Sequence, residues 1–251
     1  MTGLNTVTKV LITGFGAFQG VPSNPSWGIA QRLPSTLPNN IELIAYTSAI
    51  PVAYHPTIIL VPKLIAEHQP DIALHMGVAA DRDYFAVEQT SQREPWPVLD
   101  IEGQNFSPEE VEKVWTGQPQ KLSTDLDLHD VVAKWQNRTQ DIVFPFADGG
   151  NGNNKEKRQR VQAGQAVQVK LVEDVMAVED VRWSDSVGNY LCAFIYYADL
   201  VEMKENGKSG KRDVAFMHVP MLEGEQQLGV GVDVTVELVQ SLVESWRAQQ
   251  S

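Results

Sequence analysis

The chain has 251 residues, 43% of them hydrophobic, which is enough for one substantial core, and we expect a single domain over residues 1–251. Its formal net charge of −12 argues against a nucleic-acid partner, because phosphate binding needs a positive field. The only cysteine, Cys192, excludes an internal disulfide, and the histidines and carboxylates show no metal-ligand spacing, so we expect neither a metal nor another cofactor.

From the N-terminus onward, strand-like and helix-like patterns alternate along the chain. The predicted strands are Lys9–Thr13, Ile41–Ala49, Asp71–Met76, Val167–Val172 and Asp213–His218. The predicted helices are Ser26–Leu33, Pro56–His68, Leu126–Trp135, Gly188–Leu200 and Val232–Arg247. Residues 91–125 and 202–211 are predicted to be excursions from this pattern. The alternation favours an α/β fold with a largely parallel sheet between helical layers.

Two segments bear on secretion and membrane insertion. The opening Met1–Thr8 is polar and lacks the basic start and apolar stretch of a signal peptide. The apolar run Thr57–Ile65 is interrupted by Pro62 and Lys63 and is too short to span a bilayer. We therefore expect a cytoplasmic protein that does not bind membranes.

Cys192 follows a polar turn that contains Gly188 and precedes an apolar, aromatic stretch. A lone cysteine is more often an inert core residue than a nucleophile. In a helix over Gly188–Leu200, however, the inward stripe places Cys192 on its rim, near the N-terminal end. Free N–H groups at that end favour an anion, which could be a thiolate or an oxyanion forming beside it.

A thiol nucleophile needs a base, and the best-placed histidine is His218, which closes a strand-like run just before Pro220. Strand ends are positions where a rigid scaffold presents catalytic side chains. The other histidines are interpreted as a core residue within an apolar strand (His75) and as surface residues (His55, His68, His129). Glu88 lies within or at the end of a possible strand, and it is expected either to face outward, which the sequence favours, or to meet a cation, because a carboxylate is costly to bury unless it is paired.

Four segments of the chain resemble the pyroglutamyl-peptidase I family of cysteine peptidases and, within it, the fungal members. They are the segment Thr13–Trp27, the segment Asp83–Thr90 with Arg93 beyond it, the stretch Ser184–Cys192, and Phe216–Pro220. The four occur in the family's order. Together they carry a resemblance that no single segment would.

This resemblance implies a three-layer α/β/α sandwich with a mixed, largely parallel central sheet. It also implies a catalytic triad of Cys192, His218 and Glu88 that cleaves the bond after an N-terminal L-pyroglutamyl residue through a thioester acyl-enzyme. The substrate-binding candidates are Phe15, Phe18, Asn24 and Arg93. Arg93 is interpreted either as a ligand of the oxyanion or as a surface partner of Glu94. The expected partners are small peptides with N-terminal pyroglutamate, and the expected state is a monomer or a weak homo-oligomer.

Two alternatives remain open at this stage. Val187, Asn189 and Ala193 depart from the family pattern beside the nucleophile, so the chain could be a catalytically silent member that binds cyclised N-termini or another protein. The pair Gly14 and Gly16 after the first strand could begin a nucleotide-binding turn, but the third glycine of that motif is missing at position 19.

Overall fold

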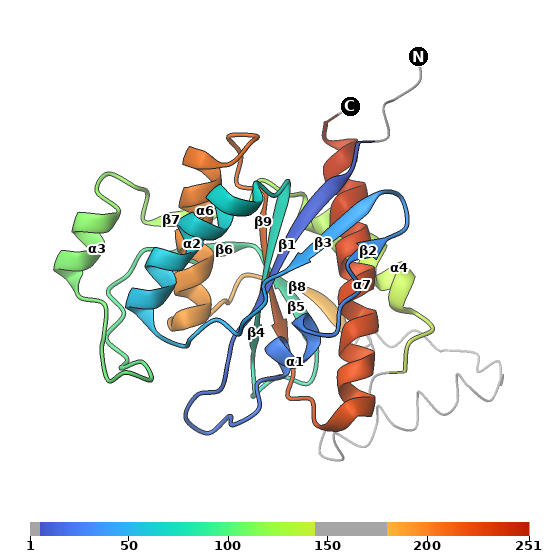
Figure 1. Ribbon diagram of the computed structural model, residues 1–251, viewed down its shortest axis with the longest axis horizontal. Coiled ribbons are helices and arrows are strands. Elements are labelled where there is room, and N and C mark those ends of the chain that lie inside the picture. The colour runs from blue at the N-terminus through green and yellow to red at the C-terminus, as the bar shows by residue number, and fades with distance from the viewer. Residues whose placement is uncertain (1–5, 144–179, 251) are drawn as a thin grey trace, which may run out of the picture.

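The computed structural model describes residues 6–143 and 180–250 and shows a central sheet with helices on both faces (Figure 1). Within these residues, the main sheet has the strand order β2-β3-β1-β4-β9-β5-β8. The strands are β1 (Thr8–Gly14), β2 (Thr36–Leu37), β3 (Ile41–Ala45), β4 (Ile72–Val78), β5 (Phe85–Glu88), β8 (Val181–Ser184) and β9 (Val214–Val219). The pairs β2–β3 and β5–β9 are antiparallel, and the other neighbours are parallel.

Helices on the two faces of this sheet enclose two separate hydrophobic cores. One core lies under α1 (Pro25–Ala30), α4 (Leu128–Thr139) and α7 (Gly224–Ala248), and includes Ile29, Trp135 and Leu238. The other lies under α2 (Tyr54–His68) and α6 (Leu191–Asn206), and includes Leu64, Phe194 and Phe216. Figure 1 shows α2 and α6 on the opposite side of the sheet from α4 and α7. The expected three-layer α/β/α fold with a mixed, mostly parallel sheet is therefore confirmed.

Residues 91–125, expected to be an excursion, contain regular structure of their own. A second sheet pairs β6 (Thr90–Gln92) with β7 (Lys121–Ser123), and α3 (Pro108–Val114) lies between them in the chain. Ser107 begins α3 with a capping box in which its side chain accepts from the N–H of Glu110. Trp96, Phe106 and Trp115 from this segment pack against Phe194 of α6. Aromatic burial thus holds the excursion to the face that carries α6.

Four predicted strands and all five predicted helices are present, and the fifth strand, Val167–Val172, lies outside the described residues. Two helices depart most from their predicted boundaries. The last helix starts at Gly224, eight residues before the expected Val232, because glycines weaken its helical pattern. Gly231 is required by packing, since a Cβ there would lie 2.7 Å from a side-chain carbon of Ile29.

The helix after Cys192 also differs from its prediction. It starts at Leu191 rather than Gly188, because Gly188 has a φ of +85° and forms part of the preceding loop. It continues to Asn206, into the expected excursion at 202–211. Nearly all of its first ten residues are buried, so no polar face marks where it should end. Among the described helices, including the 25-residue α7, none has the length and apolar character needed to cross a bilayer.

Candidate active site

Cys192 is the second residue of α6 and lies in its first turn. Tyr190, the residue just before the helix, has an extended backbone, and its side chain makes no capping hydrogen bond to the helix. The first backbone hydrogen bond of the helix runs from the N–H of Phe194 to the carbonyl of Tyr190, at 3.0 Å. The N–H groups before Phe194 are therefore not used by the helical ladder, and they give this end of α6 a partial positive charge beside the thiol.

The thiol of Cys192 lies against β4 at Gly77. A Cβ added at Gly77 would be 2.7 Å from Cys192 Sγ and 3.0 Å from Phe216 Cζ. The absence of a side chain at Gly77 is therefore what allows the sulfur to approach the sheet. In the parallel pairing of β4 with β9, the partner of Gly77 is His218. The thiol therefore packs over the strand residue that pairs with His218.

His218 is hydrogen-bonded to Glu88, which comes from the antiparallel strand β5. The Nδ1 atom of His218 lies 2.8 Å from Glu88 Oε1, and both side chains are buried. Because an ionised carboxylate can only accept, Nδ1 carries the proton and donates. Among the described residues, the hydrogen bonds of this imidazole use Nδ1 alone. Its Nε2 is therefore the atom available to act as a base.

Glu88 is fully buried, so the favoured expectation that it faces outward is wrong, and the alternative that it meets a cation holds, since Arg82 pairs with it. The cost of burial is offset by hydrogen bonds: Arg82 Nη1 and His218 Nδ1 donate to Oε1, and the N–H of Ser186 donates to Oε2. Burial alone would raise the pKa of Glu88, but the hydrogen bond and charge of His218, together with the hydrogen bond of Arg82, lower it to about 2. Glu88 is therefore a carboxylate at neutral pH.

The pKa of the Cys192 thiol is shifted upward, in contrast to the pKa of Glu88. Although part of the residue is exposed, burial raises the pKa of Cys192 to about 12, and the nearby charge of Glu88 also raises it. Arg82 and the backbone at the start of α6 act in the other direction but do not overcome burial. The resting thiol is therefore protonated, and any nucleophilic attack requires a base to remove its proton.

The two aromatic candidates for substrate binding lie on the β1–α1 loop. Phe15 is buried, and its ring approaches the same point above Gly77 as Cys192 Sγ does. Phe18 is partly buried and packs against the hydrophobic core under α2 and α6, to which Phe15 belongs. Asn24 caps α1: its Oδ1 accepts from the backbone and the hydroxyl of Ser26, and its Nδ2 donates to the carbonyl of Gly16 at 3.0 Å. Asn24 therefore stabilises the conformation of this loop through its hydrogen bonds.

Arg93 is directed toward α3. Its Nη1 donates to the carbonyl of Trp115 at 2.7 Å and lies 3.4 Å from Glu112. Its partner is thus Glu112 rather than the expected Glu94, because the helix of the excursion packs on that side. The arginine that contacts the acid Glu88 is Arg82. Sequence reasoning missed Arg82, and the one available signal was an arginine six residues before a strand-end carboxylate.

The remaining histidines have other surroundings. His75 is buried between the Thr13 hydroxyl, at 2.7 Å from Nδ1, and the Asp199 carboxylate, at 2.8 Å from Nε2, as expected for a satisfied core residue. His129 is exposed, and His55 is half-buried and bonds to Glu110. Within residues 6–143 and 180–250, no group of three or more His, Cys, Asp or Glu side chains is arranged to hold a metal ion.

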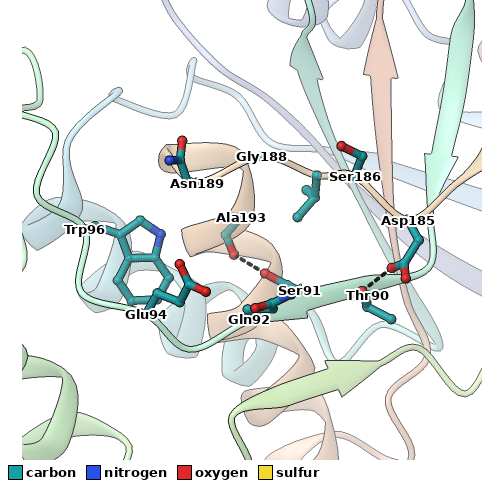
Figure 2. Close-up of a pocket in the computed structure, with 11 residues that line it drawn as sticks. Thr90, Ser91, Gln92, Glu94, Trp96, Asp185, Ser186, Gly188, Asn189 and Ala193 are labelled. Atoms are coloured by element: carbon teal, nitrogen blue, oxygen red, sulfur yellow. Dashed lines mark hydrogen bonds between the residues drawn. The ribbon is translucent and has the colours of Figure 1, made fainter.

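A cavity of about 220 Å³ lies beside the loop that leads to Cys192. Figure 2 shows Asp185, Ser186, Gly188 and Asn189 along one side of it, Ser91, Gln92 and Glu94 along the other, and Ala193 between them. The side chains of Cys192, His218 and Glu88 do not line it. The three departures from the family pattern, Val187, Asn189 and Ala193, all line this cavity.

Comparison with known sequences identifies one family. The sequence profile described as pyroglutamyl peptidase matches residues 8–138, a range that includes Gly77, Arg82 and Glu88 and ends before Cys192. The pyrrolidone-carboxylate peptidase of Thermococcus onnurineus is 33% identical over 127 residues, which cover 49% of this chain and 60% of that protein. Human pyroglutamyl-peptidase 1 is 28% identical over 240 residues, which cover 94% of this chain and 91% of the human protein.

Solved structures extend the likeness over the whole fold. The pyrrolidone carboxyl peptidase of Thermococcus litoralis superposes with a TM-score of 0.70 at 19% identity, covering 97% of this chain and 96% of that one. A mutant pyrrolidone carboxyl peptidase from Pyrococcus furiosus gives a TM-score of 0.67 at 19% identity, covering 95% of this chain and all of that one. At this level of identity, the superpositions establish a shared fold.

Proposed function

We propose that this chain, which belongs to the pyroglutamyl peptidase family, is a cysteine peptidase that removes L-pyroglutamate from the N-terminus of small peptides. Two observations support this most directly: an imidazole is hydrogen-bonded to a buried carboxylate, and a thiol packs over the strand residue that pairs with that histidine. Cys192 Sγ lies over Gly77, Gly77 pairs with His218, and His218 bonds to Glu88. These are the parts of a nucleophile, base and acid triad.

In the proposed first half-reaction, His218 Nε2 takes the proton from the Cys192 thiol as Sγ attacks the carbonyl carbon of the pyroglutamyl residue. The carbonyl oxygen becomes an oxyanion, and N–H groups in the first turn of α6 are the available donors for it. When the C–N bond breaks, the imidazolium gives its proton to the leaving amine, and a thioester between Cys192 and pyroglutamate remains. Because the resting thiol is neutral, this transfer to His218 is a required step.

In the second half-reaction, His218 removes a proton from a water molecule, whose oxygen attacks the thioester carbonyl. Collapse of that intermediate breaks the C–S bond, and the thiol regains its proton from His218 as pyroglutamate leaves. Glu88 stays ionised throughout, holds Nδ1 and stabilises the imidazolium. Arg93 has no part in this mechanism, since α3 holds its guanidinium.

Specificity for a cyclised N-terminus is proposed to come from Phe15 and Phe18. A neutral lactam ring can be held between apolar faces with a few backbone hydrogen bonds. An ordinary N-terminus carries a positive charge, which such a pocket cannot desolvate at low cost. Asn24 supports this indirectly, because its amide bonds hold the loop that carries both aromatic residues.

Several further expectations are retained as part of the proposal. They are membership of the fungal subgroup, a single domain over residues 1–251, a monomeric or weakly associating state, and a cytoplasmic location. Among the described residues, no observation specifically favours the alternative of a catalytically silent binding module. Val187 and Ala193 are buried, and the carbonyl of Ala193 accepts from Ser91 Oγ at 2.7 Å, so both have ordinary packing roles.

The test uses the full chain and two peptides that differ only at the N-terminus, one beginning with pyroglutamate and the other with glutamine. Free pyroglutamate and the shortened peptide are measured by mass spectrometry. The wild type should cleave only the pyroglutamyl peptide, and Cys192→Ala, Cys192→Ser or treatment with iodoacetamide should reduce turnover by at least about 10³-fold. Undiminished turnover by Cys192→Ala would rule out this mechanism. Binding of the pyroglutamyl peptide without cleavage by the wild type would instead establish the binding module.

A further inference from the structure

We propose that Arg82 is a positioning residue that locks the acid of the triad to the loop before the nucleophile. This inference rests on the proposed function. Arg82 lies in the turn between β4 and β5, outside the triad, and its side chain is 13% exposed. It contacts two groups that belong to different parts of the site, the carboxylate of Glu88 and the backbone of Ser186.

The contacts of Arg82 form a closed ring of three residues. Its Nη1 donates to Glu88 Oε1 at 2.8 Å, and its Nη2 donates to the carbonyl of Ser186 at 2.7 Å. The N–H of Ser186 then donates to Glu88 Oε2 at 2.9 Å. Both oxygens of Glu88 and both backbone polar groups of Ser186 are engaged in this ring. The planar fork of a guanidinium suits such a bridge, because it presents two donors in fixed directions.

Ser186 is close in sequence to the nucleophile. Residues 187–190 connect it to Leu191, where α6 begins, and Cys192 is the next residue. Fixing the backbone of Ser186 therefore limits where the first turn of α6 and its N–H groups can lie. Arg82 thus connects the position of Glu88 on β5 to the position of the thiol on α6.

Arg82 is itself held in place from two directions. Its backbone N–H donates to the carbonyl of Ala79 at 3.0 Å, which closes the turn after β4. Its guanidinium lies 5.7 Å from the ring centroid of Tyr84, and the guanidinium of Arg182 lies 3.7 Å from the same centroid. Both cations therefore interact with one aromatic ring. The bridge is consequently anchored at the arginine end as well as at Glu88.

Arg82 and His218 share one acceptor atom. Glu88 Oε1 accepts from both side chains, so the guanidinium helps to fix the oxygen that orients the imidazole. The other ionisable groups around this cluster are Cys192 and Tyr196 on α6, and Asp185 and Arg182 on the segment around β8. Arg82 and His218 donate to Glu88 Oε1, whereas the hydroxyl of Tyr196 donates to the backbone carbonyl of Glu88 at 2.8 Å.

The experiment compares the wild type with Arg82→Met, which removes charge and donors, and with Arg82→Lys, which keeps the charge but loses the fork. Arg138→Met is the matched control, because Arg138 pairs with Glu244 on the surface at 2.7 Å. For each protein, kcat and KM for a pyroglutamyl amide reporter are measured from pH 5 to pH 9, together with Tm. If Arg82→Met does not fold, Arg82→Gln replaces it as the uncharged variant.

We expect Arg82→Met to lower kcat at pH 7 by at least about tenfold with KM changed less than about threefold. Arg82→Lys should recover part of kcat, because it keeps the charge but loses the fork. A kcat of Arg82→Met or Arg82→Gln within threefold of the wild type, or a loss of activity that only follows Tm, overturns the inference. An inactive wild type would instead refute the proposed function.

Discussion

Replacement of Gly77 by alanine tests the placement of the nucleophile directly. An added Cβ would lie 2.7 Å from Cys192 Sγ and 3.0 Å from Phe216 Cζ, whereas ordinary contact begins at 3.4 Å. The φ of Gly77 is not positive, so alanine is sterically allowed in the backbone itself. The expected effect is therefore displacement of the thiol and the neighbouring ring by the new methyl group.

The size of the effect follows from these distances. The sulfur must recede by about 0.7 Å to restore ordinary contact. A misplacement of about 1 Å can cost about 100-fold in rate, so Gly77→Ala should lower kcat/KM by on the order of 30-fold, or about 2 kcal/mol. Overpacking should also lower the free energy of unfolding by about 1–3 kcal/mol.

The assay is hydrolysis of a pyroglutamyl amide reporter, measured well below the Tm of each variant. Gly229→Ala is the matched control, because Gly229 lies in α7 and a Cβ there meets nothing within 4 Å. That control should keep wild-type activity and gain up to about 1 kcal/mol of stability. Activity of folded Gly77→Ala within threefold of the wild type would refute the reasoning, since the thiol would then not depend on close approach to β4.

Two further predictions concern stability. The pKa of Glu88 falls from 4.5 to about 2 on folding, so its contribution, roughly 3 kcal/mol, is present above pH 4.5 and is lost as pH falls toward 2. Urea unfolding should therefore show a weaker loss of stability between pH 5 and pH 3 for Glu88→Gln than for the wild type, and equal slopes would contradict this. Asp199→Ala should lower the free energy of unfolding by about 1–3 kcal/mol, because it leaves Nε2 of buried His75 without its hydrogen-bond partner. Asp130→Ala, which breaks the more exposed pair with Lys134, should cost less than about 1 kcal/mol in the same urea titration, and a similar cost for both would argue against a buried pair.

The α/β fold was predictable because its signals are local. Apolar runs such as Asp71–Met76 and Asp213–His218 correspond to β4 and β9, and the periodic run Pro56–His68 corresponds to α2. The prediction failed where packing determines a boundary. The start of α7 was predicted too late because its glycines weaken the helical pattern, and the end of α6 was predicted too early because nearly all of its first ten residues are buried.

The candidate site divides in the same way. The chemical types of Cys192, His218 and Glu88, and their place at the ends of elements, were visible in the chain. The burial of Glu88 was not, because the cost of burying a carboxylate depends on partners that are distant in space. Arg82 and His218 supply those partners, and neither can be paired with Glu88 by spacing alone.

By itself, the sequence determined the main strands and helices, such as β4, β9 and α2, and which side chains could carry acid, base and nucleophile chemistry, since these follow from composition and local periodicity. Only the tertiary structure decided that the sulfur packs over a glycine that pairs with His218, that the acid is buried and ionised, and that Arg82 rather than Arg93 contacts it. The physical reason is that these properties depend on strand register and on side chains far apart in the chain, which become neighbours only when the sheet is assembled.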